Sequence, residues 1–356
     1  MLQSYNGFAT AVVAWQVQHG RNDLPWQNTR DPYKVWLSEI MLQQTQVSTV
    51  KGYFDRFLAR FPDVASLAAG TQDEVMGLWS GLGYYSRARN LHACAKQVMS
   101  LHGGAFPKDA SKLASLPGIG RSTASAISSM CFGERVAILD ANVKRVLARM
   151  RGFDGDLALA ANEKVMWQLA TELVPGEGAS LETMARYTQG MMDLGAGICS
   201  PKRPQCLLCP VSALCVARER GDQERYPVRN RKVKRSSQSL WLLCARDSDG
   251  AVWLSKRPAP GVWAGLHCLP LFESEDALRS AVSVQLQSQL ASDPPFVHVL
   301  THKDLHLHPW RLDLGRAQAQ LPVQAQTQWP EGRWVSAEEW PKLGLPAPIR
   351  KLLESL

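Results

Sequence analysis

The sequence contains no run of about 18 apolar residues, the length that a membrane-spanning helix requires, so we expect no such span. The opening segment, Met1–Trp15, has no basic stretch ahead of its apolar residues, and we expect no signal peptide. Cysteine is scarce: eight thiols in 356 residues are too few for a disulfide scaffold, which leaves free thiols or metal ligands. Strand patterns are missing before residue 235, so the first two thirds of the chain should be mostly helical.

Positive charge is in excess and unevenly placed. The formal net charge is +8, and the segment from Lys202 to Arg235 holds ten basic residues against three acidic ones. A basic surface attracts polyanions, most often nucleic acid. The end of this segment lacks apolar periodicity, which predicts a domain boundary that acts either as a solvated hinge or as a DNA-tracking linker. We therefore predict domains over 1–228 and 239–356, joined by a basic linker over 229–238.

The two predicted domains differ in their local patterns. Asp31-Pro32 is typical of a helix start, with the Asp as cap, and the apolar spacing predicts that this helix continues to Val47. After the linker, two apolar runs flank Asp247–Gly250, which indicates a β-hairpin. A helix is predicted over 276–290, followed by further strands. The second domain should therefore be a small α+β domain.

Four cysteines form a compact cluster with the pattern C-x6-C-x2-C-x5-C: Cys199, Cys206, Cys209 and Cys215. Four thiolates at this spacing suit a tetrahedral zinc ion or a [4Fe–4S] cluster. Structural zinc sites usually pair two separated C-x2-C knuckles, whereas one such pair is present here within a single loop over 199–215. The pattern therefore favours one [4Fe–4S] cluster with a structural role.

A second motif, Leu116-Pro117-Gly118-Ile119-Gly120, opens a helix and is typical of a helix-hairpin-helix turn. The two glycines allow a tight turn whose main-chain N–H groups, at a helix N-terminus, attract a phosphate. Asp140 follows twenty residues after Gly120 and precedes a basic helix, which it would cap. We predict that this hairpin contacts the DNA backbone without reading its sequence.

The hairpin, the downstream aspartate and the cysteine cluster together resemble the helix-hairpin-helix DNA glycosylase superfamily. Its iron–sulfur branch includes endonuclease III and the adenine glycosylase MutY. In bifunctional members a lysine stands two residues after the second hairpin glycine and forms a Schiff base. Here Ser122 holds that place, and a hydroxyl cannot form an imine. The resemblance therefore implies simple hydrolysis without strand cleavage.

The segment from Val35 to Gln46 closely resembles the MutY motif whose Glu is the catalytic acid. Most helical glutamates are solvated, but Glu39 has apolar neighbours one helical step away, which favours a raised pKa and a proton donor. The resemblance assigns catalysis to Glu39, Asp140 and Asn142. It further implies an adenine pocket and DNA wedge formed by Leu24, Trp26, Gln43, Tyr84, Ser122 and Gln189. The residues expected to bind DNA phosphates are Gly118, Gly120, Lys144 and Arg145.

The C-terminal domain resembles the Nudix-like domain that MutY carries, on the motif Gly261–Leu266. The acidic metal-binding pattern of Nudix enzymes is absent, so we expect a recognition module. In the family a Phe-Ser-His loop in this domain contacts 8-oxoguanine. Here Leu300-Thr301-His302 stands in that place, keeps a hydroxyl at Thr301, and lacks the aromatic ring.

The fold implied is a helix-hairpin-helix glycosylase fold, with two helical subdomains and a cleft, followed by an α+β Nudix-like domain. The function implied is a monofunctional DNA glycosylase that removes adenine mispaired with 8-oxoguanine or guanine in double-stranded DNA during base excision repair. We expect a monomeric, cytoplasmic protein with no membrane partner. The alternatives are an endonuclease III-like pyrimidine glycosylase with lyase activity and a non-catalytic binder of DNA structure. Ser122 argues against the first, and Glu39 with Asp140 against the second.

Overall fold

A computed structural model describes residues 7–228, 235–314 and 329–355, and its chain divides into two compact units. The first comprises 1–69 and 90–232, and the second comprises 70–89 and 233–356. The basic linker predicted over 229–238 lies largely outside the described residues. The placement of 70–89 in the second unit differs from the continuous first domain that we expected from the sequence. No helix among the described residues is both long and apolar enough to cross a bilayer.

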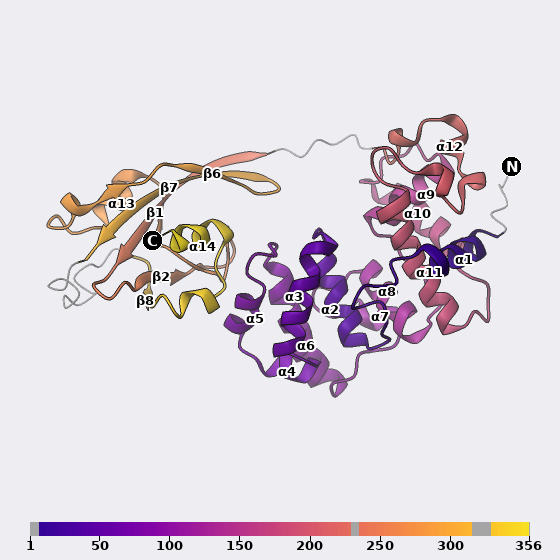
Figure 1. The fold of residues 1–356 in the computed structure, drawn as a ribbon, viewed down its shortest axis with the longest axis horizontal. Coiled ribbons are helices and arrows are strands. Elements are labelled where there is room, and N and C mark those ends of the chain that lie inside the picture. Colours follow the sequence, from indigo (N-terminus) through magenta and orange to yellow (C-terminus); the bar gives the residue numbers. More distant parts are fainter. Residues whose placement is uncertain (1–6, 229–234, 315–328, 356) are drawn as a thin grey trace. The chain divides into compact units, whose positions relative to one another are not determined.

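The first unit is helical, and α6 enters it from the 70–89 segment (Figure 1). Helix α8 packs against α2 and α11, and α11 in turn packs against α1, α9 and a π-helical turn. The helices are α1 (Phe8–His19), α2 (Pro32–Leu42), α3 (Val47–Arg60), α4 (Val64–Ala69), α6 (Ser86–His102), α7 (Ala110–Leu113), α8 (Arg121–Phe132), α9 (Ala141–Arg151), α10 (Ala160–Glu172), α11 (Leu181–Asp193) and α12 (Val216–Arg220). Short π and 3-10 turns occupy Leu194–Ile198, Cys206–Leu208, Ser212–Leu214 and Gln223–Arg225.

Helix α2 begins where the sequence predicts and ends earlier. The Asp31 carboxylate accepts a hydrogen bond from the Tyr33 N–H at 2.9 Å, and Pro32 occupies the first helical position. The helix ends at Leu42, and α3 starts separately at Val47. The prediction of one helix through Val47 is therefore wrong. Gln44 breaks it with a φ of 58°, a left-handed conformation that no glycine or proline announces in the sequence.

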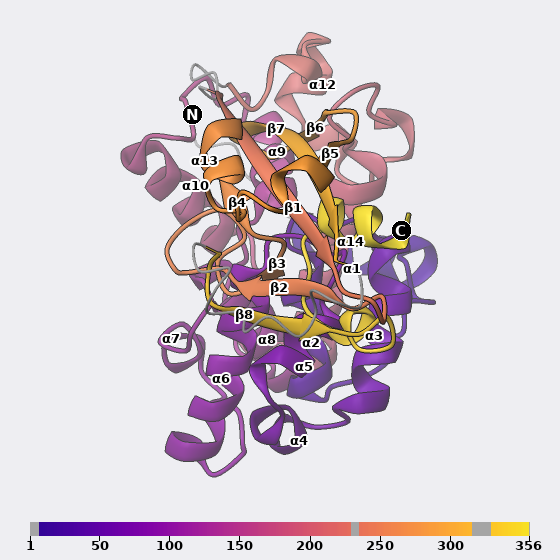
Figure 2. The ribbon, with the colours of Figure 1, turned by 90° about the vertical axis from the view of Figure 1, so that its left-hand side faces the viewer.

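The second unit is built on one mixed sheet, with α5 (Gln72–Leu78) from the 70–89 segment. Strands β1 and β7 pair in parallel from Ser236↔Lys303 to Arg246↔Asp313, and Figure 2 shows them side by side. The remaining strands extend the sheet in the order β3-β2-β1-β7-β5. The strands are β1 (Ser236–Arg246), β2 (Val252–Lys256), β3 (His267–Cys268), β4 (Leu271–Phe272), β5 (Ala291–Ser292), β6 (Phe296–Val299), β7 (Lys303–Asp313) and β8 (Gly332–Val335).

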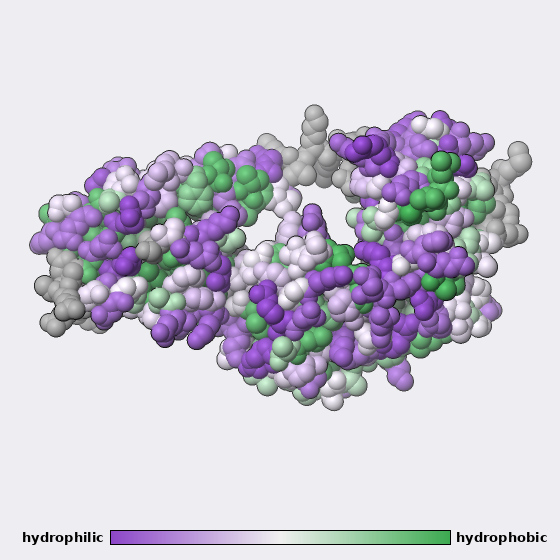
Figure 3. Space-filling view, viewed as in Figure 1, coloured by the Kyte–Doolittle hydropathy of each residue, from purple (hydrophilic) through white to green (hydrophobic). Residues whose placement is uncertain are grey.

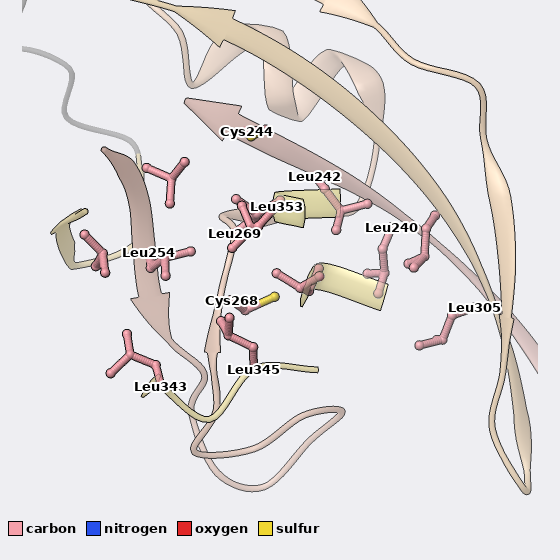
Figure 4. Close-up of a cluster of buried hydrophobic side chains, with 14 residues drawn as sticks. Leu240, Leu242, Cys244, Leu254, Cys268, Leu269, Leu305, Leu343, Leu345 and Leu353 are labelled. Carbon is pink, nitrogen blue, oxygen red and sulfur yellow. The ribbon is translucent and has the colours of Figure 1, made fainter. Parts of the chain in front are cut away.

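Both faces of this sheet are buried, which explains the nearly continuous apolar runs in the sequence. Side chains alternate between faces along a strand, so Leu240 and Leu242 enter one core and Leu243 the other. Figure 4 shows the first core, where Leu345 and Leu353 from the C-terminal segment meet the sheet. Helix α14 (Ala347–Glu354) covers this face, and α13 (Glu275–Ser280) packs on β1 and β4.

The helix predicted over 276–290 is wrong in length. It ends at Ser280, and only a 3-10 turn follows at Gln287–Gln289. The next residues include the β-branched Val282 and Val284, which have weaker helix propensity. The Gln287 amide donates to the carbonyls of Arg279 and Val282, which satisfies main-chain acceptors at the helix end.

Hydrophilic side chains cover most of the face of the molecule seen in Figure 3.

Candidate active site and metal centre

Glu39 lies near the end of α2, one turn beyond Val35 on the same face of the helix. Burial, and after it the negative charge of Asp140, raise the pKa of its carboxyl from 4.5 to about 7, while Arg21 acts in the opposite direction. A carboxyl with a pKa near 7 is protonated in about half of the molecules at neutral pH, whereas an ordinary glutamate is almost fully ionised there. Glu39 can therefore donate a proton, as the sequence pattern predicts for a general acid.

Asp140 caps α9, as its position before a basic helix predicts. Its carboxylate accepts a hydrogen bond from the Val143 N–H at 2.7 Å and further hydrogen bonds from Asn142. Burial raises the pKa of Asp140 above its ordinary value, whereas these hydrogen bonds and the charge of Arg145 oppose the rise. Desolvation is thus the largest influence on both carboxyls, and the difference between them is that hydrogen-bond donors oppose it at Asp140.

Arg145, one turn after Asn142 on α9, is 9% exposed and donates inward. Its guanidinium bonds the Asn142 side-chain oxygen at 3.0 Å, the Gly195 carbonyl at 2.7 Å and the Cys199 carbonyl at 2.7 Å. This geometry disagrees with the prediction that Arg145 binds a DNA phosphate, because its guanidinium donates hydrogen bonds to acceptors inside the protein. A continuous set of hydrogen bonds instead joins the first cysteine of the cluster loop to Asp140.

Gly195 lies where the π-helical turn meets the first residues of α9. A β-carbon at this position would come within 2.7 Å of the Asn142 β-carbon and within 3.2 Å of its carbonyl oxygen. Only glycine allows this approach, so the residue fixes the distance between the turn and Asn142. Lys144 on the same helix is paired with Glu163 at 2.6 Å and remains partly exposed.

The four cysteines predicted as metal ligands line one cavity, together with Ile198 and Pro204. All are free thiols, and burial, followed by the other cluster thiols, raises the pKa of Cys209 to about 12. Among the described residues no three His, Cys, Asp or Glu side chains stand close enough to hold a single metal ion. The charges of Cys199, Cys206 and Cys215 influence Cys209, so the four thiols lie close together in this loop.

Arg149 holds the loop that carries these cysteines, and sequence reasoning assigned it no role. It is 1% exposed and donates to the carbonyls of Ser200 at 2.7 Å, Pro201 at 2.9 Å and Gln223 at 2.8 Å, with its Nη1 3.4 Å from the Cys199 sulfur. The available signal was the four-residue spacing of Arg145 and Arg149, which places both on one helix face.

The predicted hairpin connects α7 to α8. Gly118 has a φ of 76°, and a β-carbon there would come within 2.7 Å of the Asn90 β-carbon, so glycine is required. Gly120 precedes α8 with no side-chain cap, and a β-carbon there would meet no protein atom. The first N–H groups of α8 have no intrahelical partner, and no side chain caps them. Ser122, in the first turn, accepts a hydrogen bond from the Leu139 N–H at 3.0 Å.

A cavity of about 370 Å³ lies beside α2, α8 and α11. Trp26 and Gln189, both predicted for the adenine pocket, line it, as do Val35 and Met130. Trp26 is buried with its ring edge-on to Phe54 at 5.3 Å, and Leu24 is buried nearby in the sequence. Gln189 donates to Asp193 at 2.9 Å. Asp193 also forms a 2.7 Å ion pair with Arg21, a partnership that the sequence did not reveal.

The two predicted wedge residues fall in different units. Gln43 ends α2 in the first unit, with its amide 3.5 Å from the Thr123 hydroxyl. Tyr84, with a φ of 48°, belongs to the second unit, where its hydroxyl lies 2.8 Å from that of Thr301. Tyr84 and the predicted recognition loop are thus brought together, which the distance in sequence did not suggest.

Leu300-Thr301-His302 forms the tip between β6 and β7. Leu300 packs against the core, while Thr301 and His302 are exposed. Arg235 holds the tip by donating to the carbonyls of Leu300 at 3.0 Å and Thr301 at 3.2 Å, and it also pairs with Asp304. The loop therefore presents a hydroxyl and an imidazole to solvent from a fixed backbone.

Two family models match the chain. Residues 37–175 match the HhH-GPD superfamily base excision DNA repair proteins, and residues 241–355 match a NUDIX domain. The adenine DNA glycosylase of Buchnera aphidicola subsp. Acyrthosiphon pisum is 35% identical, with 98% of this chain and 97% of that protein covered. The human adenine DNA glycosylase is 32% identical over 97% of this chain and 73% of its own length.

A solved structure of a thermostable thymine-DNA glycosylase shares the fold of the helical part. Its TM-score is 0.53 at 32% identity, and the match covers 60% of this chain and 95% of that one. These similarities agree with the predicted fold class, a helical hairpin-containing region followed by an α+β Nudix-like domain.

Proposed function

Since this chain belongs to the adenine DNA glycosylase family, we propose that it hydrolyses the N-glycosidic bond of adenine mispaired with 8-oxoguanine or guanine in duplex DNA. The observation that carries the proposal is a pair of half-buried carboxyls, Glu39 and Asp140, of which only Asp140 has its pKa lowered by hydrogen-bond donors. Such pairs divide acid and base roles between two chemically similar groups. The adenine must first leave the base stack, at a cost of a few kcal/mol of unstacking.

In the proposed reaction Glu39, in its neutral form, protonates N7 of the flipped adenine, which makes the base a good leaving group. Cleavage leaves an oxocarbenium-like sugar, and the Asp140 carboxylate stabilises its positive charge. Water then adds at C1′ and gives its proton to the Glu39 carboxylate, which restores the acid. Asn142 is a positioning residue that holds Asp140, and it is held in turn by Arg145. Because the pKa of Glu39 is about 7, the single-turnover rate falls as pH rises above that value.

The proposed enzyme is monofunctional. Ser122 stands at the position of the lyase lysine, and its hydroxyl already accepts the Leu139 N–H. The test uses one duplex with a single A:8-oxoguanine pair, on which base release and strand nicking are measured separately. Adenine release with an intact abasic strand supports the proposal. Nicking without alkali would indicate an endonuclease III-like lyase, and binding without release a non-catalytic DNA binder.

The proposed cofactor is one [4Fe–4S] cluster held by Cys199, Cys206, Cys209 and Cys215. The four thiols line one cavity within a single loop, an arrangement that suits a four-iron cluster better than the two separated knuckles of a structural zinc site. When bound, the cluster supplies a rigid cross-link for the loop. Metal analysis of anaerobically purified protein should give four irons per chain, and stoichiometric zinc would contradict this assignment.

The proposed DNA contacts are the hairpin and the exposed tip. No protein atom lies close enough to Gly120 to exclude a side chain there, so we attribute the glycine to the close approach of a DNA phosphate. Lys144 adds positive charge. If six or more phosphates are neutralised, affinity falls by roughly 10³-fold or more between 50 and 200 mM salt. Thr301 and His302, with Leu300 beneath them, contact the 8-oxoguanine. Two further residues are wedges that fill the gap in the base stack: Tyr84, whose hydroxyl lies next to that of Thr301, and, separately, Gln43. Leu24, Trp26 and Gln189 line the adenine pocket.

A further inference from the structure

Two arginines, Arg87 and Arg89, stand in the first turn of α6, whose four residues include no acidic one. The helix dipole opposes positive charge at this end of a helix. Arg87 is nevertheless buried, with 8% of its surface exposed. A cation that is both desolvated and placed against the dipole must gain from the contacts that it makes.

The contacts of Arg87 reach back to the loop that precedes the helix. Its Nη2 donates to the carbonyls of Leu82 at 3.3 Å and Gly83 at 3.2 Å, and its main-chain N–H donates to the Tyr84 carbonyl at 2.9 Å. Its guanidinium carbon lies 5.5 Å from the centre of the Tyr84 ring and 5.3 Å from that of Trp79. The side chain therefore folds from the helix onto the loop and its aromatic residues.

Tyr84 is the residue that this arrangement holds in place. Its φ of 48° is left-handed, a conformation that a residue with a β-carbon keeps only where its surroundings impose it. Its side chain is 44% exposed, so packing alone restrains the ring on one side only. A guanidinium over the ring adds a cation–π attraction, which is strongest when the cation is desolvated, as Arg87 is. Burial lowers the pKa of Arg87 to about 10, so it keeps its charge at neutral pH.

We propose that Arg87 is a positioning residue that fixes the orientation in which the Tyr84 ring enters the base stack. The inference rests on the proposed function, in which Tyr84 is a wedge, and goes beyond it by naming the residue that orients this wedge. Arg87 acts through the ring of Tyr84, whereas the Tyr84 hydroxyl lies beside Thr301. The two contacts can therefore be removed separately.

The test is a double-substitution cycle on the full-length protein, with Arg87→Met and Tyr84→Leu made singly and together. A 2-aminopurine next to an A:8-oxoguanine pair reports stacking, because its fluorescence rises when it loses contact with the neighbouring bases. Titration of the same duplex gives the affinity. A fluorine at C2′ of the mispaired adenosine destabilises the oxocarbenium-like sugar and keeps the base in place, so both measurements are independent of catalysis.

Arg87→Met should reduce the fluorescence rise and weaken the affinity by roughly 2- to 30-fold, the range of cation–π contacts. In the Tyr84→Leu background it should change neither quantity, because the ring through which it acts is gone. Arg87→Lys keeps the charge without the planar fork, so it should lose less than Arg87→Met, and it replaces that variant in the cycle if Arg87→Met does not fold.

Arg89→Met is the matched control, since it removes an arginine from the same turn whose guanidinium donates to the Ala264 carbonyl. Its effect should be the same with and without the Tyr84 ring.

The cycle separates positioning from a general effect on the fold. Equal losses from the Arg87 substitution in the presence and absence of the Tyr84 ring would overturn the inference. So would an Arg87→Met protein, or a Tyr84→Leu protein, that behaves as the wild type in both measurements. A wild type that releases no adenine from an unmodified A:8-oxoguanine duplex would overturn the proposed function instead, and the cycle would still decide the role of Arg87.

Discussion

The helical unit and the sheet of the second unit bury different kinds of side chain. Among the described residues the helical unit encloses Arg145, Arg149 and Asp193, at 9%, 1% and 2% exposure. The sheet-forming part, residues 235–314 and 329–355, buries no charged side chain, and its predicted recognition residues Thr301 and His302 are exposed. Burial is what raises a carboxyl pKa, whereas an exposed loop can contact a base without paying for desolvation.

The difference teaches where substitutions should matter. Buried charged groups are coupled through shared hydrogen bonds, so a change at one of them alters the chemistry itself. In the proposed function, exposed groups at the tip between β6 and β7 act on the choice of substrate. The comparison predicts loss of rate in the first unit and loss of preference in the second.

The largest effect is expected at the acid. Glu39→Gln removes the transferable proton, so adenine release should fall by roughly 10²- to 10⁴-fold, the usual contribution of general acid–base catalysis. Binding of the A:8-oxoguanine duplex should persist, because the substitution keeps the shape of the side chain. Single-turnover rates and equilibrium binding are the measurements. Release at a rate near that of the wild type would remove Glu39 from the mechanism.

The same substitution should also change how stability depends on pH. Because burial raises the pKa of Glu39 to about 7 from 4.5, the folded protein binds a proton that the unfolded chain has lost. Wild-type stability therefore falls as pH rises between these values, by up to about 3 kcal/mol relative to Glu39→Gln. Urea unfolding of both proteins at pH 5 and pH 8 measures this. A difference between them that is independent of pH would mean that Glu39 is solvated.

Gly195→Ala tests the coupling within the helical unit. The added β-carbon would meet Asn142 at 2.7 Å, so the start of α9 must shift. A displacement of about 1 Å in a catalytic group can cost roughly 10²-fold in rate, and we expect that loss in adenine release. Gly197→Ala is the control, since a β-carbon there meets nothing within 4 Å. Equal rates for the two variants would show that Asn142 does not position Asp140.

The smallest effect belongs to the exposed tip. Thr301→Val removes the hydroxyl that lies 2.8 Å from that of Tyr84 and keeps the shape. One neutral hydrogen bond is worth about 0.5–1.5 kcal/mol, so the preference for 8-oxoguanine over guanine opposite adenine should fall by roughly 2- to 10-fold. The rate on saturated substrate should not change, and Thr301→Ser should behave as the wild type. A slower chemical step with an unaltered preference would reverse the comparison.

Local signals in the sequence predicted where helices and strands form, but they did not predict which residues contact each other. The Asp31-Pro32 cap, the hairpin glycines and the apolar runs around Asp247–Gly250 are each read from a few neighbouring residues, and the structure places helix starts and strands at these positions. The roles of Arg145 and Arg149 were not predictable in this way. A basic helix looks the same whether its arginines face DNA or donate to carbonyls about fifty residues away.

The cavity illustrates the same limit. Trp26 and Gln189 could be named from a resemblance, but the ion pair between Arg21 and Asp193 joins residues 172 positions apart. Sequence patterns predict what a residue can do, and packing decides which partners it has.

The 70–89 segment has a consequence for how the chain acquires its structure during synthesis. The hydroxyls of Ser80 and Tyr85 donate to the Leu345 carbonyl, across separations of 265 and 260 residues. At ribosomal speeds of about 5–20 residues per second, on the order of tens of seconds pass between the synthesis of Ser80 and the synthesis of Leu345. Until then its polar groups must be satisfied by water or by a chaperone, and the nascent chain carries an unfinished surface for most of its translation.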